Sequence, residues 1–341
     1  PADCSYAQSC PACSNPAIQS NEKIEAGMNA LAQGAFRITF NPIAGFDYQG
    51  GHPNFRGLTP EKEIIAVPLH NHVVELSFYR IPLNLEYTFV KNWSAWLHIP
   101  YDIKVQKANV EFVEPVSLYE STAILRNRDI HHRNENYKGF SDAKFLISHR
   151  LTNVVNKKDR LDIAIGTSLP LGKTEGNPLK AADDGEKHLH IQFGTGTFNP
   201  LLELHYSAAV NNKTTLSIFT INKLPFYENK KNYRGPIETT SGLGLSYSIS
   251  KQLTFRGNFS QLFMSHAFWD DVVDPNSGLF ALNGMLGATH NLKNGLMISP
   301  MFRFPIYQRT LTSEGDTFKF GPTFLLNVSF LLNTKKNDTK Q

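Results

Sequence analysis

The feature that most constrains this chain is an alternation of apolar and polar residues that recurs about twelve times. Within residues 141–151 the polar side chains fall mostly on even positions and the apolar ones on odd positions, and residues 161–169 repeat this order. A period of two is typical of a β-strand whose two faces meet different surroundings. A soluble sandwich has the same period, so the number and order of the segments must decide between the two classes.

About twelve extended segments follow one another after residue 34. Each is at least as long as the ~9 to 11 residues that a tilted membrane strand needs. We predict strands at residues 35–46, 71–90, 93–109, 140–152, 160–171, 189–210, 214–226, 237–249, 253–265, 279–290, 296–307 and 317–332.

The connectors between these segments alternate between two kinds. Short polar connectors are expected at residues 91–92, 153–159, 211–213, 250–252 and 291–295. Longer irregular ones are expected at residues 47–70, 110–139, 172–188, 227–236, 266–278 and 308–316. Outer-membrane barrels sort their loops in this way, with short periplasmic turns and longer extracellular loops. The sequence therefore predicts an all-β transmembrane antiparallel barrel of about 12 strands in a bacterial outer membrane, with both termini in the periplasm.

The composition agrees with this fold class. No run of roughly 18 apolar residues is present, which excludes a helical membrane span. The 24 Phe and 12 Tyr favour strands. The net charge of +4 is small and its basic residues are scattered, so nucleic acid is not an expected partner.

Several strands show which face meets lipid. Odd positions from Trp93 to Val105 are apolar, and in the last strand we expect one lipid-facing row, made of Phe318, Phe320, Phe324, Leu326, Val328, Phe330 and Leu332. The second and sixth strands change phase near residues 78–80 and 199–200. A β-bulge at each place would restore the register.

The barrel is expected to span residues 35–334, between a periplasmic segment at 1–34 and a polar tail at 335–341. Cys4, Cys10 and Cys13 are the chain's only cysteines. Three thiolates at this spacing could bind zinc or another soft metal; the alternatives are one disulfide with a free thiol, and attachment to a partner. A short helix is expected at residues 20–34, either as a plug in the lumen or docked on a partner.

The alternation also predicts which charged and polar side chains point into the lumen. Both signs occur in comparable number, which favours internal ion pairs over an ion-selective pore, because unpaired buried charge is costly. The predicted lumen residues are Arg80, Glu86, His98, Asp102, Lys104, Asp142, Lys144, Arg150, Asp162, Glu203, His205, Arg256, Arg303 and Lys319.

Histidines gather on the long-loop side of the predicted barrel, at His52, His70, His72, His131, His132, His188, His190 and His266. The pairs His70/His72 and His188/His190 have a spacing of two, which places both rings on one strand face. With acidic residues at 183, 184 and 186 they form a candidate cation site at the mouth. Solvated loop histidines are the alternative interpretation.

Three motifs in the centre of the chain carry a family resemblance. They are Gly-Phe-Ser-Asp-Ala at 139–143, Ile-Gly-Thr-Ser-Leu-Pro-Leu-Gly-Lys at 165–173, and Phe-Gly-Thr-Gly-Thr-Phe-Asn-Pro-Leu-Leu at 193–202. In order and spacing this block resembles the outer-membrane barrels labelled as the meta-pathway of phenol degradation family, distant relatives of fatty-acid and aromatic-hydrocarbon channels. The resemblance implies a barrel that passes small apolar or aromatic molecules. It does not include the cysteine segment.

Two functions are therefore predicted. The first is a passive channel for small apolar or aromatic solutes, gated by residues 1–33. The second is a non-transporting accessory barrel in a larger outer-membrane complex, with a metal or disulfide at its cysteines. Catalysis is not expected: His205 and Ser207 have the His-x-Ser spacing of outer-membrane lipases, but they lie toward the short-turn end, away from outer-leaflet lipid.

Overall fold

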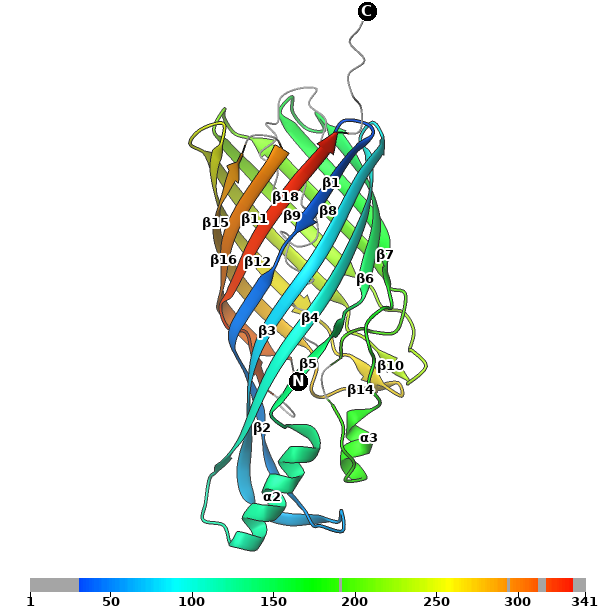
Figure 1. The fold of residues 1–341 in the computed structure, drawn as a ribbon, viewed down its shortest axis with the longest axis vertical. Helices are drawn as coiled ribbons and strands as arrows, with labels where there is room; N and C mark the ends of the chain where they lie inside the picture. Colours follow the sequence, from blue (N-terminus) through cyan, green and yellow to red (C-terminus); the bar gives the residue numbers. More distant parts are fainter. Residues whose placement is uncertain (1–30, 190–191, 293–294, 312–316, 334–341) are drawn as a thin grey trace, which may run out of the picture.

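The computed structural model describes residues 31–189, 192–292, 295–311 and 317–333. Its strands form one closed antiparallel β-barrel (Figure 1). The barrel closes because β1 (Ala35–Phe40) pairs with both β3 (Ile64–Val90) and β18 (Thr323–Asn333). Closure removes the unpaired sheet edges that lipid could not satisfy.

The wall has 12 strand positions, three of which are shared by two consecutive elements. β1 continues into β2 (Ile43–Leu58), β5 (Glu135–Phe140) into β6 (Ala143–Thr152), and β17 (Thr317–Lys319) into β18. The remaining wall strands are β3, β4 (Trp93–Phe112), β7 (Asp159–Leu169), β8 (Pro200–Ala209), β9 (Thr214–Lys223), β11 (Glu238–Ser248), β12 (Leu253–Met264), β15 (Leu279–Asn291) and β16 (Leu296–Thr310). The predicted fold class, strand number and strand order are thus confirmed.

The outer surface of the wall is apolar. Large exposed side chains project from successive strands at every second residue, among them Leu243, Leu245, Phe255, Phe259 and Leu286. In water such a continuous belt would be an aggregation hazard, whereas it is the surface that a barrel presents to lipid. Among the described residues, no helix is long and apolar enough to cross a membrane.

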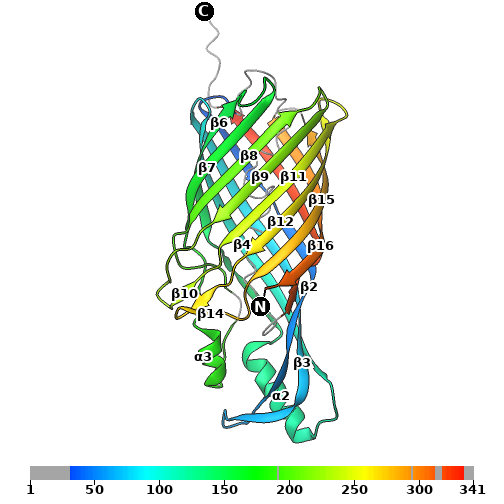
Figure 2. The same cartoon turned by 180° about the vertical axis from the view of Figure 1, so that it is seen from behind.

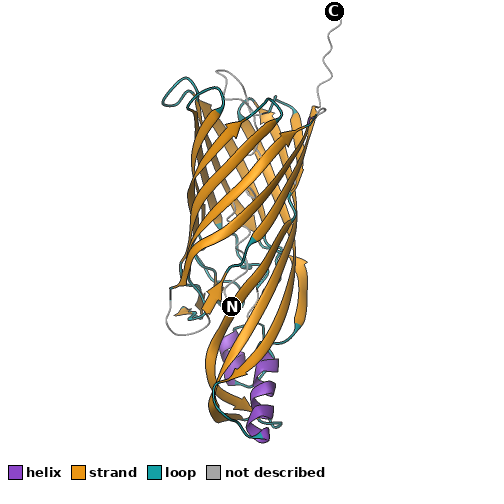
Figure 3. Cartoon of the chain, turned by 90° about the vertical axis from the view of Figure 1, so that its left-hand side faces the viewer, coloured by secondary structure: helices purple, strands orange, loops and turns teal. Residues whose placement is uncertain are grey.

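The two ends of the barrel differ. Short turns join the strands at one end, and at the other β2, β3 and β4 continue well past the rim (Figures 1 and 2). The helix α2 (Leu118–His131) packs against this extension, with Ala123 and Ile124 fully buried. Its start is fixed by a capping box between Ser117 and Glu120. Figure 3 shows that α2 lies beyond the barrel, at the end with the long loops.

A second group of loops folds beside the extension. It contains α3 (Pro178–Asp183) and a small sheet of β10 (Tyr233–Arg234), β13 (Phe268–Trp269) and β14 (Val272–Val273). Asp270 joins the two parts: its carboxylate accepts hydrogen bonds from the side-chain amides of Asn177 and Asn232 and pairs with Lys180. The long loops are therefore ordered by packing of their own.

Three expectations about the strands are wrong. Residues 47–70 are a β2–β3 hairpin rather than an irregular loop, because His52 and its neighbours pair regularly with β3. The sixth strand begins at Pro200, and residues 192–199 before it are not strand. β3 keeps one phase through residues 78–80, with no register shift there.

The last strand also differs from the expectation. Phe318 and Phe320 are buried inside the barrel, whereas Phe324, Leu326 and Phe330 face outward. The phase changes at Gly321 and Pro322, between β17 and β18. An added Cβ at Gly321 would lie 1.7 Å from the carbonyl oxygen of Phe46, so the close strand crossing requires glycine there. The predicted helix at residues 20–34 lies almost wholly outside the described residues.

Candidate functional site

The short-turn half of the lumen is filled by buried ion pairs. Arg80 on β3 and Asp102 on β4 are register partners, and the guanidinium donates two hydrogen bonds of 2.6 and 2.5 Å to the carboxylate. Both side chains are almost fully buried, at 1% and 0% exposure. The hydroxyl of Ser141 donates to the same carboxylate. Because the carboxylate accepts three hydrogen bonds, two of them from the arginine, its charge is compensated and the pair can lie in the barrel interior.

Further pairs continue around the wall. Arg150 on β6 donates to Asp162 on β7 at 2.5 Å. Lys223 on β9 pairs with Glu238 on β11, and Arg37 on β1 lies 3.6 Å from Glu86 on β3. Each pair joins neighbouring strands, so the pairs cross-link the wall from inside.

The predicted lumen residues occupy the inward-facing positions with one exception. Lys319 is exposed, because β17 has the phase opposite to the one expected. Arg256 and Arg303 are half-buried, and Arg303 donates to the hydroxyls of Tyr48 and Thr323. The buried ones are Arg80, Glu86, His98, Asp102, Lys104, Asp142, Lys144, Arg150, Asp162, Glu203 and His205.

Toward the long-loop end the inward-facing side chains are mostly apolar instead, and on β15 and β16 this apolar group reaches nearer to the short turns. We call this group the apolar lumen cluster; three of its members, Met264, Met285 and Met301, are methionines, out of 5 in the chain. Unbranched thioether side chains repack easily around a guest. The cluster consists of Ile43, Tyr48, Leu76, Phe78, Tyr137, Leu262, Met264, Leu279, Ala281, Met285, Met301, Phe318, Phe320 and Leu325, with Leu189 and Phe193 packed against it.

Residues 192–199, here called the inner loop, fold into the barrel between the two halves. Asp142, at the junction of β5 and β6, holds the loop: its carboxylate accepts from the backbone N–H of Thr195 at 2.7 Å and from the Thr195 hydroxyl at 2.9 Å. The same carboxylate accepts from the backbone N–H of Gly172 at 3.1 Å. One aspartate therefore joins three segments that are far apart in sequence.

Two glycines make this contact possible. An added Cβ at Gly194 would lie 2.1 Å from the Asp142 carboxylate, and one at Gly172 would lie 2.5 Å from the backbone nitrogen of Gly194. Any side chain at either position would push the loop off the carboxylate. The three motifs that carry the family resemblance thus meet at Asp142.

The rest of the inner loop is held by polar contacts on one side and ring contacts on the other. Lys104 donates to the carbonyl of Gln192 at 2.7 Å, and its ammonium lies 4.5 Å from the ring centre of Phe193. The amide of Asn199 donates to the hydroxyls of Ser168 and Thr195. The loop therefore caps the polar half while Phe193 faces the apolar lumen cluster.

Comparison with known proteins supports the fold. A crystal structure of an outer membrane channel from Pseudomonas putida F1 matches with a TM-score of 0.58 at 8% identity, over 90% of this chain and 98% of that one. The sequence matches no protein-family profile and no curated protein. The fold is that of an outer-membrane channel barrel.

Other solved barrels align over similar lengths but less well. A TodX monoaromatic hydrocarbon channel mutant matches with a TM-score of 0.44 at 10% identity, over 94% of both chains. A Pseudomonas aeruginosa FadL homologue matches with a TM-score of 0.40 at 10% identity, over 89% of this chain and 91% of that one. The fold assignment rests on the Pseudomonas putida F1 channel and on the strand pairing itself.

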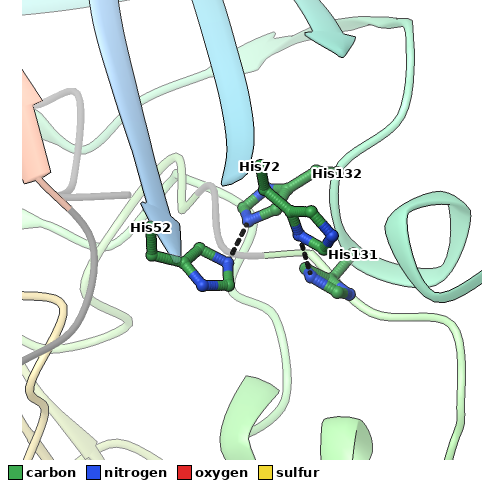
Figure 4. A group of neighbouring side chains, drawn as sticks. All are labelled: His52, His72, His131 and His132. Atoms are coloured by element: carbon green, nitrogen blue, oxygen red, sulfur yellow. Dashed lines mark hydrogen bonds between the residues drawn. The ribbon is translucent and has the colours of Figure 1, made fainter. Parts of the chain in front are cut away.

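At the long-loop end of this outer-membrane barrel, four histidines meet: His52, His72, His131 and His132, which we call the histidine cluster (Figure 4). One possible ligand nitrogen from each ring lies within 4.8 Å of the others. Burial lowers the pKa of His131 well below its ordinary value of 6.5, and the neighbouring imidazoles lower it further. This ring is therefore a neutral imidazole near pH 7, able to act as a ligand.

The predicted cation site is only partly assembled. His72 belongs to the histidine cluster; His70 and His188 flank it, with ring centres 5.1 Å from His72 and 5.5 Å from His131. His190 lies outside the described residues. The predicted site lacks His52, His131 and His132, although the His131-His132 doublet is a signal visible in the sequence.

Other predicted sites have the following positions. Cys4, Cys10 and Cys13 lie outside the described residues, so a metal or disulfide there stays a prediction. His205 and Ser207 are buried on the inner face of β8, and the imidazole of His205 lies 3.5 Å from the Glu203 carboxylate. Asp183 and Glu186 are exposed and pair with Arg56 and Lys62.

Proposed function

We propose that this barrel is a passive channel for small apolar or aromatic solutes. The observation that carries the proposal is the apolar lumen cluster, which lies inside the barrel at the long-loop end. If the lumen served only to be filled by ion pairs, no group of apolar side chains would be needed inside the barrel. The likeness in fold to the outer membrane channel from Pseudomonas putida F1 supports the same function.

The solute would enter among the methionines and aromatic rings and displace contacts that cost little to remake. The inner loop would be the next barrier, because it separates this half from the ion pairs. It is held by hydrogen bonds to Asp142, Lys104 and Ser168 rather than by strand pairing. Such a segment can detach without breaking the wall.

The loop asymmetry supports an orientation as well. Short turns face the periplasm in outer-membrane barrels and long loops face outward. In this orientation the apolar lumen cluster opens toward the exterior, and Ala35 at the start of β1 lies on the periplasmic side. Protease added to intact cells should then cut within residues 113–117, where Val113 is exposed, and leave the short turns uncut.

The test is uptake of a labelled monoaromatic hydrocarbon by cells with an intact lipopolysaccharide leaflet, with and without the full chain. The channel function predicts faster uptake by cells that express the chain. The uptake rate should rise with the amount of folded barrel in the membrane. Two results together would contradict it. Uptake would have to be equal in cells with and without the chain while folded barrel is present in the membrane, and it would have to stay equal after the inner loop is released.

A second candidate is a non-transporting accessory barrel within an outer-membrane complex. The buried ion pairs favour it, because they fill and cross-link the lumen at the short-turn end. Partners would then bind the extension of β2, β3 and α2, and the cysteines at 4, 10 and 13 would hold a metal or a disulfide. Co-purification in mild detergent of stoichiometric partners, together with absent uptake, would support this function over the channel.

A further inference from the structure

The histidine cluster is built from two pairs of rings. The first pair is a cross-strand pair: His52 on β2 and His72 on β3 are register partners, with ring centres 5.0 Å apart. A register shift between Gly45 and Tyr48, with Asp47 at a φ of 55°, sets the phase of β2 so that His52 shares the face of His72. Both imidazoles consequently point toward α2.

The second pair comes from the end of α2. His131 is the last residue of the helix and His132 is its C-cap, and their ring centres are 4.4 Å apart. The carboxyl end of a helix carries a partial negative charge, which favours a cation placed there. The cluster therefore lies at the end of the helix that attracts positive charge.

The nitrogen positions suit a small metal ion. Nε2 of His52 lies 3.2 Å from Nε2 of His132, and Nδ1 of His72 lies 3.0 Å from Nε2 of His131. Imidazole nitrogens bind Zn²⁺ at about 2.0–2.1 Å, which places two ligands of a tetrahedral site about 3.3 Å apart. Each pair is already near that spacing, and small ring rotations would bring the two pairs around one centre.

Hydrogen bonding orients one of the rings as a metal ligand. Nδ1 of His52 lies 3.1 Å from the carbonyl oxygen of Pro53. A carbonyl only accepts, so Nδ1 carries the proton and Nε2 presents its lone pair toward His132. A backbone carbonyl on the second ring nitrogen is the usual support of a metal-bound histidine.

We propose that His52, His72, His131 and His132 bind one divalent late transition-metal ion, Cu²⁺ more tightly than Zn²⁺. Four imidazoles with no thiolate select this class, and Cu²⁺ exceeds Zn²⁺ in affinity for nitrogen sites. The bound ion cross-links α2 to the β2–β3 hairpin and so fixes the extension at the long-loop end. The proposal is independent of the channel function, since no lumen residue takes part.

The same ring contacts could instead be simple hydrogen bonds between imidazoles, with one ring donating to the next. The two arrangements differ in stoichiometry and spectrum. A metal site binds one ion per chain and gives a copper signal with several nitrogen ligands, whereas a hydrogen-bonded cluster gives neither.

The experiment uses the full chain with Cys4, Cys10 and Cys13 all changed to Ser, purified in detergent without a histidine tag and stripped with chelator. Cu²⁺ and Zn²⁺ are titrated separately, and the copper form is studied by electron paramagnetic resonance. We expect one ion per folded barrel, tighter binding of Cu²⁺, and hyperfine coupling to three or four nitrogens. Absence of stoichiometric copper, or a signal without nitrogen ligands, would overturn the proposal.

Matched variants locate the site. His52→Gln changes the half-buried ring and should weaken Cu²⁺ binding by about tenfold or more. The ring of His149 lies 4.3 Å from that of Trp93 at the opposite end of the barrel, so His149→Gln should leave the affinity unchanged. Equal affinities in both variants would place the copper elsewhere and overturn the assignment. The spectrum of the chain with all four histidines intact does not depend on how either variant folds.

Discussion

The carboxylate of Asp142 binds the inner loop through Thr195, accepting 2.7 and 2.9 Å hydrogen bonds from its backbone N–H and its hydroxyl. Hydrogen bonds to a charged group each contribute about 1.5–3 kcal/mol. Asp142 and Thr195 come from opposite ends of the block that resembles a known family. Asp142 therefore makes the two charge-assisted bonds that hold the middle of the inner loop, while Lys104 and Asn199 hold its two ends.

Asp142→Ala should release the inner loop while the wall remains intact, because Asp142 lies between β5 and β6 rather than within a strand. We expect uptake of a labelled monoaromatic hydrocarbon to rise severalfold over the unaltered chain, and residues 192–199 to exchange their amide hydrogens faster. Asp159→Ala is the control, since Asp159 accepts hydrogen bonds from the short turn at residues 154–156 and from the Tyr206 hydroxyl, and has no contact with the inner loop. Unchanged exchange in the inner loop of Asp142→Ala would contradict the role given to Asp142.

Gly194→Ala should reproduce this effect without removing any hydrogen-bonding group. Its Cβ would lie 2.1 Å from the Asp142 carboxylate, so either the loop or the carboxylate must move. Overpacking of this kind costs about 1–3 kcal/mol. Gly176→Ala provides the comparison, because nothing lies within 4 Å of a Cβ added there. Hydrogen exchange of residues 192–199 should increase in the first variant alone, and an equal response in both would refute the steric explanation.

How far the sequence predicts this structure depends on the range of the interactions. Most of the twelve strands are predictable because they alternate over a length that lipid dictates, and the charges at positions such as Arg80 and Asp102 follow from the same alternation; the seventh strand follows only from its position in the chain. The alternation assigns the wrong face, inward or outward, to residues at places where the wall changes strand partners, as at Gly321 between β17 and β18. A period of two has no information about such a crossing.

The candidate site was less predictable, because its members come together only in three dimensions. The motif containing Gly194 read as the start of a strand, since no local pattern shows that its glycines exist to approach Asp142. His52 was placed in a loop because the bulge that turns β2 inward depends on pairing with β3. His131 ends a helix and His132 caps it, and the all-β composition does not suggest that helix.

The loop group at α3 should resist moderate acid. Hydrogen bonds from Asn232, Lys180 and Asn177 lower the pKa of Asp270 from 3.8 to about 2. A carboxyl whose pKa is depressed in the folded state contributes stability above its ordinary pKa and loses it as the pH falls through the lower value. The contacts of α3 should therefore persist to about pH 4 and weaken progressively between there and about pH 2.

Proteolysis of residues 178–184 by an acid-active protease measures this change. In Asp270→Asn the pH dependence should vanish, since the amide cannot titrate, and cleavage should already be faster at neutral pH because the pair with Lys180 is lost. Cleavage that rises with falling pH to the same extent in both chains would show that another group controls the loops.

The Arg80–Asp102 pair tests whether the lumen charges stabilise the wall or only fill it. Removing one partner leaves the other charge buried and alone, which costs about 3–5 kcal/mol. Asp102→Leu should therefore lower markedly the urea concentration at which the folded band disappears in a semi-native gel. Because a well-packed apolar pair can replace a buried ion pair at little cost, Arg80→Met with Asp102→Leu should recover most of that loss.

The exposed pair Arg56–Asp183, at 2.9 Å, is the matched control, with side chains 56% and 70% exposed. Its removal should change the free energy of unfolding by less than about 1 kcal/mol, and hence the urea midpoint only slightly, because solvent screens surface pairs. If the double variant were as unstable as Asp102→Leu, filling the space with apolar side chains would not be enough. The charges themselves would then be required, because they also interact with Ser141 and with the neighbouring ion pairs. The unfolding midpoints of the three variants and the unaltered chain decide between these outcomes.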